Sequence, residues 1–194
     1  MINNDQVEKM SDEDIVKLAL QNQDYFLHII NRYQLRLFNF IRRITNASTE
    51  DAEDLLQEIF LKIYLNLNDF DRGLKFSSWA YAIARNQVIS HHRKLQARAE
   101  GHTVALEDES VKQIAADFDI KNNIDLQCLR ENVFKILDNL DDKYREVLVL
   151  KFLEEKSYQE ISDIIKKPIG TVGSMMNKAK TEFQKELSRQ KIKL

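Results

Sequence analysis

Proline and glycine are scarce in this chain of 194 residues, which contains one proline and four glycines. A β-sandwich or β-barrel needs turn residues at short intervals, so the scarcity argues against these folds and favours helices. The single cysteine, Cys128, excludes an internal disulfide and a zinc site built from this chain's cysteines, and we interpret it as a structural thiol. The apolar run Val147–Leu150 is far too short to span a membrane, and no secretory signal is recognisable at the start. We therefore expect a soluble, cytoplasmic protein with no membrane insertion.

A large net charge of either sign is also missing, because 29 basic residues stand against 31 acidic ones. The balance hides an uneven distribution. Glu50–Glu58 contains five acids and no base, whereas Arg85–Arg98 contains four Arg or Lys residues, two histidines and no acid. Lys166–Leu194 carries eight basic residues against two glutamates. This distribution fits a protein that touches a basic protein surface and a polyanion at once, although solvated helix faces would look the same.

The acidic segment lies at the start of a predicted helix. Ser48, with Asp51 three residues later, resembles a capping box, and acids in a first turn complement the positive end of a helix. From there the apolar residues keep helical spacing for four turns, and polar residues occupy the other side. The apolar positions are Ala52, Leu55, Leu56, Ile59, Phe60, Ile63, Tyr64 and Leu67. One face of this helix is thus predicted to pack, and the other is predicted to be available.

A second helix is predicted from Trp79 to about Leu95, capped by the serine pair Ser77 and Ser78. Its alanine, isoleucine and valine positions suit a core, but a mixed set of aromatic and basic side chains does not. This set comprises Trp79, Tyr81, Arg85, Asn86, His91, His92 and Arg93. Such groups can present rings and cations to single-stranded nucleic acid, and the alternative is that the rings pack in the core.

The helical period weakens between Gln96 and about Asp125, which we interpret as a flexible tether with a short helix at Val111–Phe118. Beyond it, helices are predicted at Leu126–Asn139 and Asp141–Leu153. A short helix headed by a capping box at Ser157 follows, then a break at the only proline, then a helix opened by Thr171. This order is typical of a helix-turn-helix domain. The fold class predicted is all-α, with two small helical domains at 1–96 and 126–194 and a linker at 97–125.

Five segments in this order resemble a bacterial RNA polymerase sigma factor of the extracytoplasmic-function (ECF) group. Asp51–Leu61 is similar to the family's polymerase-docking segment, and Phe76–Asn86 is similar to its promoter-melting helix. Leu140–Leu150, together with Ser157–Ile161 and Pro168–Val172, is similar to its C-terminal DNA-binding domain. The resemblance implies a dissociable promoter-specificity subunit that binds core RNA polymerase and promoter DNA, duplex and melted, with no cofactor, metal or catalysis of its own. An anti-sigma factor is a further candidate partner, since family members are often held inactive by one.

The resemblance also implies site residues. Polymerase docking is carried over to Asp51, Glu53, Asp54, Gln57 and Glu58. Recognition of the minus-ten promoter element, with a flipped base, is carried over to Phe70, Phe76, Trp79, Tyr81, Arg85, Asn86 and Arg93. Minus-thirty-five binding is carried over to Thr171, Ser174, Asn177 and Lys178, with Thr171 also expected to cap its helix.

The sequence departs from the family pattern at two places that affect how the C-terminal domain would read DNA. Gly173 and Met175 stand where the family commonly has cations, and Lys166 and Lys167 stand in the turn where it commonly has glycine and a small apolar residue. We therefore expect a nonstandard minus-thirty-five sequence or weaker direct readout.

Two functions of other kinds compete with this one. A helix-turn-helix regulator acting without polymerase docking would explain the C-terminal domain but not the acidic helix. A metal-dependent phosphohydrolase would use His91, His92 or His102. The sequence, however, has no recognisable metal-ligand spacing and no phosphate-binding loop.

Overall fold

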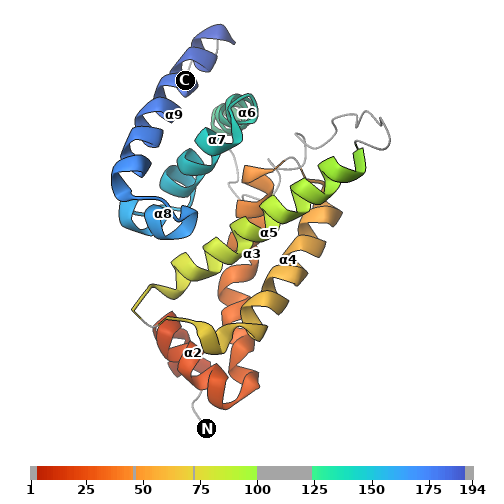
Figure 1. Cartoon of the computed structure of the whole chain (residues 1–194), viewed down its shortest axis with the longest axis vertical. Coiled ribbons are helices and arrows are strands. Elements are labelled where there is room, and N and C mark those ends of the chain that lie inside the picture. Colours follow the sequence, from red (N-terminus) through yellow and green to blue (C-terminus); the bar gives the residue numbers. More distant parts are fainter. Residues whose placement is uncertain (1–3, 46, 72, 100–123, 191–194) are drawn as a thin grey trace.

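The computed structural model describes residues 4–45, 47–71, 73–99 and 124–190, and every regular element in these ranges is helical. This confirms the predicted all-α class with two helical domains (Figure 1). The N-terminal domain contains α1 (Asn4–Glu8), α2 (Asp12–Gln21), η1 (Gln23–Tyr25), α3 (Phe26–Ile44), α4 (Thr49–Leu65), η2 (Leu67–Asp69) and α5 (Phe76–Ala99). The C-terminal domain contains α6 (Ile124–Asp138), α7 (Asp142–Leu148), the π-helical turn η5 (Val149–Leu153), α8 (Tyr158–Ile165) and α9 (Ile169–Arg189).

The core of the N-terminal domain lies where α3, α4 and α5 pack against one another. On each helix, apolar residues three or four positions apart form a buried stripe, and the three stripes face one another. Their members include Ile29, Tyr33, Leu37 and Phe40 of α3, Ala52, Leu55, Ile59 and Ile63 of α4, and Phe76, Ala80, Ala84 and Val88 of α5. Because the buried stripe uses one side of α4, the opposite side of the helix is left to solvent.

In the C-terminal domain, α6, α7, α8 and α9 pack around apolar side chains that are continuous with the core of the N-terminal domain. The buried side chains of the C-terminal domain are mostly isoleucine, leucine and valine, at helical spacing. They include Ile136, Leu140, Val147, Leu150, Ile161, Ile164, Ile165, Val172 and Met176. The two domains touch mainly through α8, which lies beside α5, and through α7 and η5, which approach α3 (Figure 1).

Several helix limits differ from those predicted. The helix predicted from Trp79 is α5, which begins at Phe76 and continues to Ala99. Ser77 and Ser78 therefore lie inside its first turn instead of capping it. The helix predicted at Asp141–Leu153 gives way to the π-helical turn η5 at Val149. Helices α1 and α2 were not predicted. The predicted helix at Val111–Phe118, and most of the linker at 97–125, lie outside the described residues, and the domain limits stay a prediction.

Candidate polymerase and promoter surfaces

The acidic residues of α4 begin at a capped N-terminus. Ser48 is the N-cap, as predicted, and its Oγ accepts a hydrogen bond from the backbone N–H of Asp51 at 3.1 Å. The same hydroxyl donates to Asp51 Oδ2 at 2.8 Å. Capping therefore fixes the first turn, where acids also interact favourably with the helix dipole.

All five residues predicted for docking are exposed on this helix; we call Asp51, Glu53, Asp54, Gln57 and Glu58 the acidic ridge. Two of its members also have internal roles. Asp51 belongs to the cap, and Glu58 accepts a hydrogen bond from Gln87 of α5, which in turn accepts one from Lys62. Glu53 and Asp54 have no polar partner within the described part of the chain. These two carboxylates are the members of the ridge best placed to meet an external cation.

The ridge continues into apolar residues that the sequence pattern did not single out as a surface. Leu61 and Leu65 are 58% and 66% exposed, and they extend the line of Asp54 and Glu58 at helical spacing. Tyr64, beside them, helps to line a shallow hollow with Phe26, Leu27 and Ile30. The sequence did contain a signal for the exposure of Leu61 and Leu65, namely their helical spacing from the exposed acids. Leucines on the same side of a helix as exposed acids cannot point into the core. An apolar anchor next to a charged ridge is the usual composition of a protein-binding surface.

The aromatic residues predicted to contact the minus-ten element gather at the start of α5. Phe70, Phe76 and Trp79 contact one another with ring centroids 5.3 to 5.7 Å apart, and Tyr33 of α3 packs edge-on against Phe76 at 5.4 Å. Phe76 is fully buried and Phe70 is 7% exposed, whereas Trp79 is partly exposed. In this arrangement Phe70 and Phe76 support the surface from below, and Trp79 is the ring of this cluster that reaches it.

The remaining minus-ten candidates divide between two sides of α5. Trp79, Asn86 and Arg93 recur every seven residues and so lie along one side, where Asn86 and Arg93 are exposed. Tyr81 and Arg85 lie on another side, which faces the C-terminal domain. The structure thus brings the first three together and separates the last two from them.

The Tyr81 and Arg85 side chains are engaged by carboxylates of the C-terminal domain. Tyr81 is fully buried and its hydroxyl donates to Glu154. Arg85 pairs with Glu146 of α7, with its Nε donating to Oε1 and its Nη2 donating to Oε2 at 3.2 Å. Burial raises the pKa of Glu146, and the Arg85 guanidinium partly offsets that rise. Two groups predicted to serve DNA are therefore occupied within the chain.

Glu154 is the centre of this contact between the domains. Besides Tyr81, it receives the Nη1 of Arg43 from α3 at 2.8 Å, and both side chains of this ion pair are less than a tenth exposed. Lys156 places its Nζ 4.3 Å from the centre of the Tyr81 ring, and burial together with the nearby Arg36 lowers the pKa of Lys156. The domains are thus joined through buried charged and polar groups, which are costly to leave unpaired.

The helix-turn-helix segment begins as predicted with a capping box. Ser157 Oγ accepts from the backbone N–H of Glu160 at 3.2 Å, and Glu160 Oε2 accepts from the N–H of Ser157 at 2.9 Å. After α8, Lys166 takes a left-handed backbone conformation with φ of 54°. Glycine adopts this conformation most readily, which explains why a helix-turn-helix turn favours glycine there and why Lys166 is a departure.

Helix α9 starts two residues earlier than predicted. Its N-cap is Pro168, with no capping side chain, and the Thr171 N–H donates to the Pro168 carbonyl at 2.8 Å. The expectation that Thr171 caps this helix is therefore wrong, because that residue already lies in the first turn. Ser174, whose Oγ donates to the Thr171 carbonyl at 2.9 Å, is exposed, as are Asn177 and Lys178.

Gly170 and Gly173 shape the same leading edge of α9. A methyl group added at either glycine would meet no atom within 4 Å, so neither is required by packing inside the protein. Their lack of side chains leaves the helix backbone approachable from outside. Thr171, Ser174 and Lys178 share this edge at helical spacing, with Asn177 adjacent. The edge has the size and polarity suited to entering a DNA major groove.

Metal and membrane features are not evident in the described ranges. Within residues 4–45, 47–71, 73–99 and 124–190, no three His, Cys, Asp or Glu side chains are arranged to hold a metal ion. None of the helices in these ranges combines the length and apolar character needed to cross a bilayer.

Comparisons with known proteins match both domains of the chain. The family model for Sigma-70 region 2 matches residues 29–98, and the model for Sigma-70 region 4 matches residues 130–183. The chain is 32% identical to the ECF RNA polymerase sigma factor SigW of Bacillus subtilis (strain 168), covering 93% of this chain and 98% of the relative. It is 29% identical to the ECF RNA polymerase sigma-E factor of Escherichia coli (strain K12), covering 89% and 92%.

Two solved structures share the fold. The sigma factor RpoE from Bartonella quintana, in complex with the anti-sigma factor NepR, superposes with a TM-score of 0.69 at 23% identity, covering 84% of this chain and 96% of RpoE. CnrH, in complex with the cytosolic domain of CnrY, superposes with a TM-score of 0.67 at 20% identity, covering 92% and 97%.

Proposed function

This chain belongs to the extracytoplasmic-function group of RNA polymerase sigma factors, and we propose that its two domains divide polymerase docking and promoter recognition between them in a specific way. As a sigma factor it directs core RNA polymerase to promoters. The observation that carries the division of labour is the separation of an exposed acidic ridge on α4 from an exposed polar edge on α9. The domain limits are taken as 1–96 and 126–194, with the linker between them.

In this proposal the acidic ridge docks on a basic surface of the polymerase. Glu53 and Asp54 supply carboxylates that meet no polar partner among the described residues, and Leu61 and Leu65 supply the adjacent apolar contact. Opposite charges steer the encounter and fix its register, while burial of the leucines adds hydrophobic stabilisation. Asp51 and Glu58 contribute as part of the same ridge, although each also stabilises the fold.

The minus-ten element would meet the side of α5 that carries Trp79, Asn86 and Arg93. Trp79 offers a ring on which an unstacked base can lie, and Arg93 offers a cation to the backbone. Phe70 and Phe76 hold the position of this surface from the core. Tyr81 and Arg85 would join the DNA contact only after Glu154 and Glu146 release them.

The minus-thirty-five element would meet the leading edge of α9. Ser174 and Asn177 are placed to reach base edges, and Lys178 and Thr171 are placed to contact bases or phosphates. With glycine at 173 and methionine at 175, few cations face the groove, so a large share of the recognition falls on hydrogen bonds from these short side chains.

We assign this activity to the cytoplasm, where core polymerase works, and no catalysis to the chain itself, since the polymerase makes the phosphodiester bonds. RpoE from Bartonella quintana is bound to the anti-sigma factor NepR in its solved structure. A polypeptide inhibitor of this kind is a candidate partner for the present chain as well.

The deciding experiment is transcription in vitro by core polymerase on a fragmented genomic library, with and without the purified protein. New start sites that share sequence about ten and thirty-five positions upstream support the proposal. Their absence would refute it. A helix-turn-helix regulator without polymerase docking would instead bind duplex fragments but fail to bind core polymerase.

A further inference from the structure

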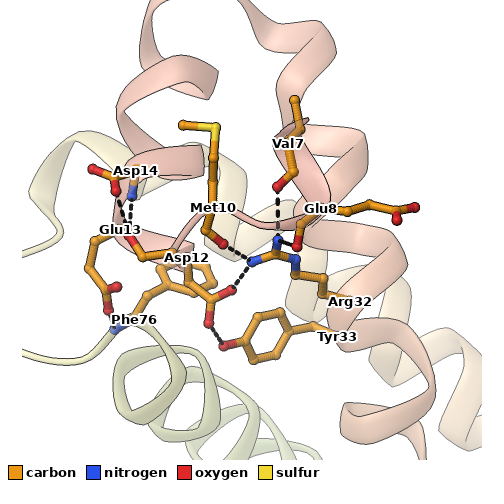
Figure 2. A network of polar contacts seen from close by, with 10 residues as sticks. Val7, Glu8, Met10, Asp12, Glu13, Asp14, Arg32, Tyr33 and Phe76 are labelled. Carbon is orange, nitrogen blue, oxygen red and sulfur yellow. Dashed lines mark hydrogen bonds and ion pairs between the residues drawn. The ribbon is translucent and has the colours of Figure 1, made fainter. Parts of the chain in front are cut away.

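The promoter-facing helix α5 is held at its first residue by a carboxylate from a distant part of the chain. The backbone N–H of Phe76 donates to Glu13 Oε1 of α2 at 2.9 Å, across 63 residues of sequence (Figure 2). Lys75, which precedes α5, carries a donor and so cannot accept a hydrogen bond from the free N–H groups of the first turn. Glu13 does so in its place, and its charge suits the positive end of the helix.

Glu13 can serve as a fixed support because α2 is itself tied to α3. Ser11 caps α2 by accepting from the Asp14 N–H at 3.1 Å. Asp12, beside Glu13, receives Arg32 Nη1 at 2.8 Å and the hydroxyl of Tyr33. Figure 2 shows these contacts together with the bonds from Arg32 to the carbonyls of Val7, Glu8 and Met10, at 3.0, 2.7 and 2.9 Å.

The residue that Glu13 holds is also the centre of the aromatic cluster. The Phe76 ring touches Tyr33 from one helix, Phe70 from the segment before α5, and Trp79 one turn onward. A small change in the position of the Phe76 backbone would therefore move Phe70 and Trp79 as well. The Glu13 contact sets where the start of α5 and its partly exposed tryptophan stand relative to the rest of the domain.

We propose that Glu13 is a positioning residue for minus-ten recognition, acting through the first turn of α5 and without touching DNA. The inference rests on the proposed function of α5. Holding the Trp79 surface in one position before DNA arrives lowers the ordering cost of binding an unstacked base. The acidic ridge on α4 has no contact with this network among the described residues, so docking on the polymerase is expected to be independent of Glu13.

The test compares Glu13→Ala and Glu13→Gln with wild-type protein, each assembled with core polymerase. The probe is a fluorescent single-stranded oligonucleotide carrying the minus-ten sequence identified by the transcription experiment. Glutamine keeps the acceptor oxygen and loses the charge, whereas alanine loses both. We expect Glu13→Ala to weaken oligonucleotide binding by about three- to tenfold, the range that follows from losing a helix cap, with Glu13→Gln recovering much of this loss. Affinity for core polymerase is expected to stay at the wild-type value.

Glu8→Gln is the matched control, because it removes an exposed carboxylate from the neighbouring helix without touching α5. Wild-type oligonucleotide binding by Glu13→Ala would overturn this inference alone. Equal losses of core and oligonucleotide affinity, with a parallel fall in thermal midpoint, would also overturn it by showing a general structural role. A wild-type holoenzyme that fails to bind the oligonucleotide would instead overturn the proposed function of α5.

Discussion

The outward sides of α4 and α5 differ in how much of each is already paired within the chain. On α4, Glu53 and Asp54 point to solvent and meet no polar partner among the described residues. On α5, Tyr81 and Arg85 are paired with Glu154 and Glu146 of the other domain. The surface proposed for polymerase docking is open in the free chain, while part of the surface proposed for DNA is closed.

Under the proposed function, the closed part of α5 includes a cation, Arg85, whose carboxylate partner Glu146 could be replaced by a DNA phosphate. A carboxylate such as Glu146 satisfies Arg85 much as a phosphate would, since both present oxygens to the same guanidinium fork. In the proposed complex, separation of the domains would exchange the Glu146 carboxylate for a DNA phosphate as the anionic partner of Arg85. Trp79, Asn86 and Arg93 need no such exchange, so under the proposed function we expect them to make the first contact with the promoter.

The largest effect is expected from reversing charge on the open surface. Glu53→Lys with Asp54→Lys should weaken core binding by about a thousandfold, because like charges brought together at an interface cost several kcal/mol. This pair spares Asp51 and Glu58, whose internal bonds would complicate the result. Affinity for fluorescently labelled core polymerase measures the effect, and helical content by circular dichroism checks the fold.

The matched control for that double variant is Glu182→Lys with Glu186→Lys, which reverses two carboxylates on α9. Its core affinity should be near that of the wild-type protein. Undiminished core binding by the α4 variant would show that the ridge is not the docking surface.

A somewhat smaller effect is expected from variants that break the contact between the domains and so expose Tyr81 and Arg85. Glu146→Gln with Glu154→Gln leaves Arg43 and Arg85 without these countercharges, and breaking a buried ion pair costs about 3–5 kcal/mol. The domains should separate, so the radius of gyration from small-angle X-ray scattering should rise, and single-stranded minus-ten DNA should bind the free protein more tightly. Glu155→Gln changes an exposed neighbour and should alter neither quantity. An unchanged radius would mean that other contacts hold the domains together.

On α9, Asn177→Ala with Lys178→Ala should weaken binding of minus-thirty-five duplex DNA by about tenfold and make it less dependent on salt. Core binding through α4 should not change. Lys180→Ala is the control, since Lys180 lies on another side of α9 with its Nζ 5.7 Å from the Phe152 ring. An equal loss for Lys180→Ala in an electrophoretic mobility assay would contradict the assigned edge.

The smallest expected effect concerns pH. Partial burial alone would raise the pKa of Glu160, but hydrogen bonds from Ser157 and from Lys75 outweigh it and lower the pKa to about 2. A lowered pKa means that the carboxylate stabilises the fold above its ordinary value of 4.5, and that this stabilisation is lost as pH falls toward 2. Glu160→Gln should therefore cost about 1 kcal/mol of unfolding free energy at pH 7.

Urea unfolding at several pH values tests this expectation. The gap between wild-type protein and Glu160→Gln should shrink steadily between pH 4.5 and 2. Asp163→Asn, which removes a partly exposed carboxylate outside the capping box that accepts a hydrogen bond from Gln159, should show a much smaller gap. A gap that is constant with pH would show that the charge of Glu160 does not contribute.

Much of the fold could be predicted because its signals are local. The caps at Ser48 and Ser157, the apolar spacing of α4 and the order of helices in the C-terminal domain all depend on residues three or four positions apart. The start of α5 was predicted incorrectly because the serine pair suggested a local cap, whereas Glu13 supplies the acceptor from another helix. Leu61 and Leu65 were missed as a surface because leucine ordinarily signals a core.

The resemblance to sigma factors supplied the candidate DNA-binding residues, whereas the sequence pattern alone showed that this protein is helical and which side of α4 is acidic. It could do so because helix periodicity, capping and charge act over one or two turns. Which of the candidate residues are open and which are paired within the chain depends instead on contacts between helices. Arg43 meets Glu154 across 111 residues and Glu13 meets Phe76 across 63, and no local spacing records such contacts because packing between helices creates them.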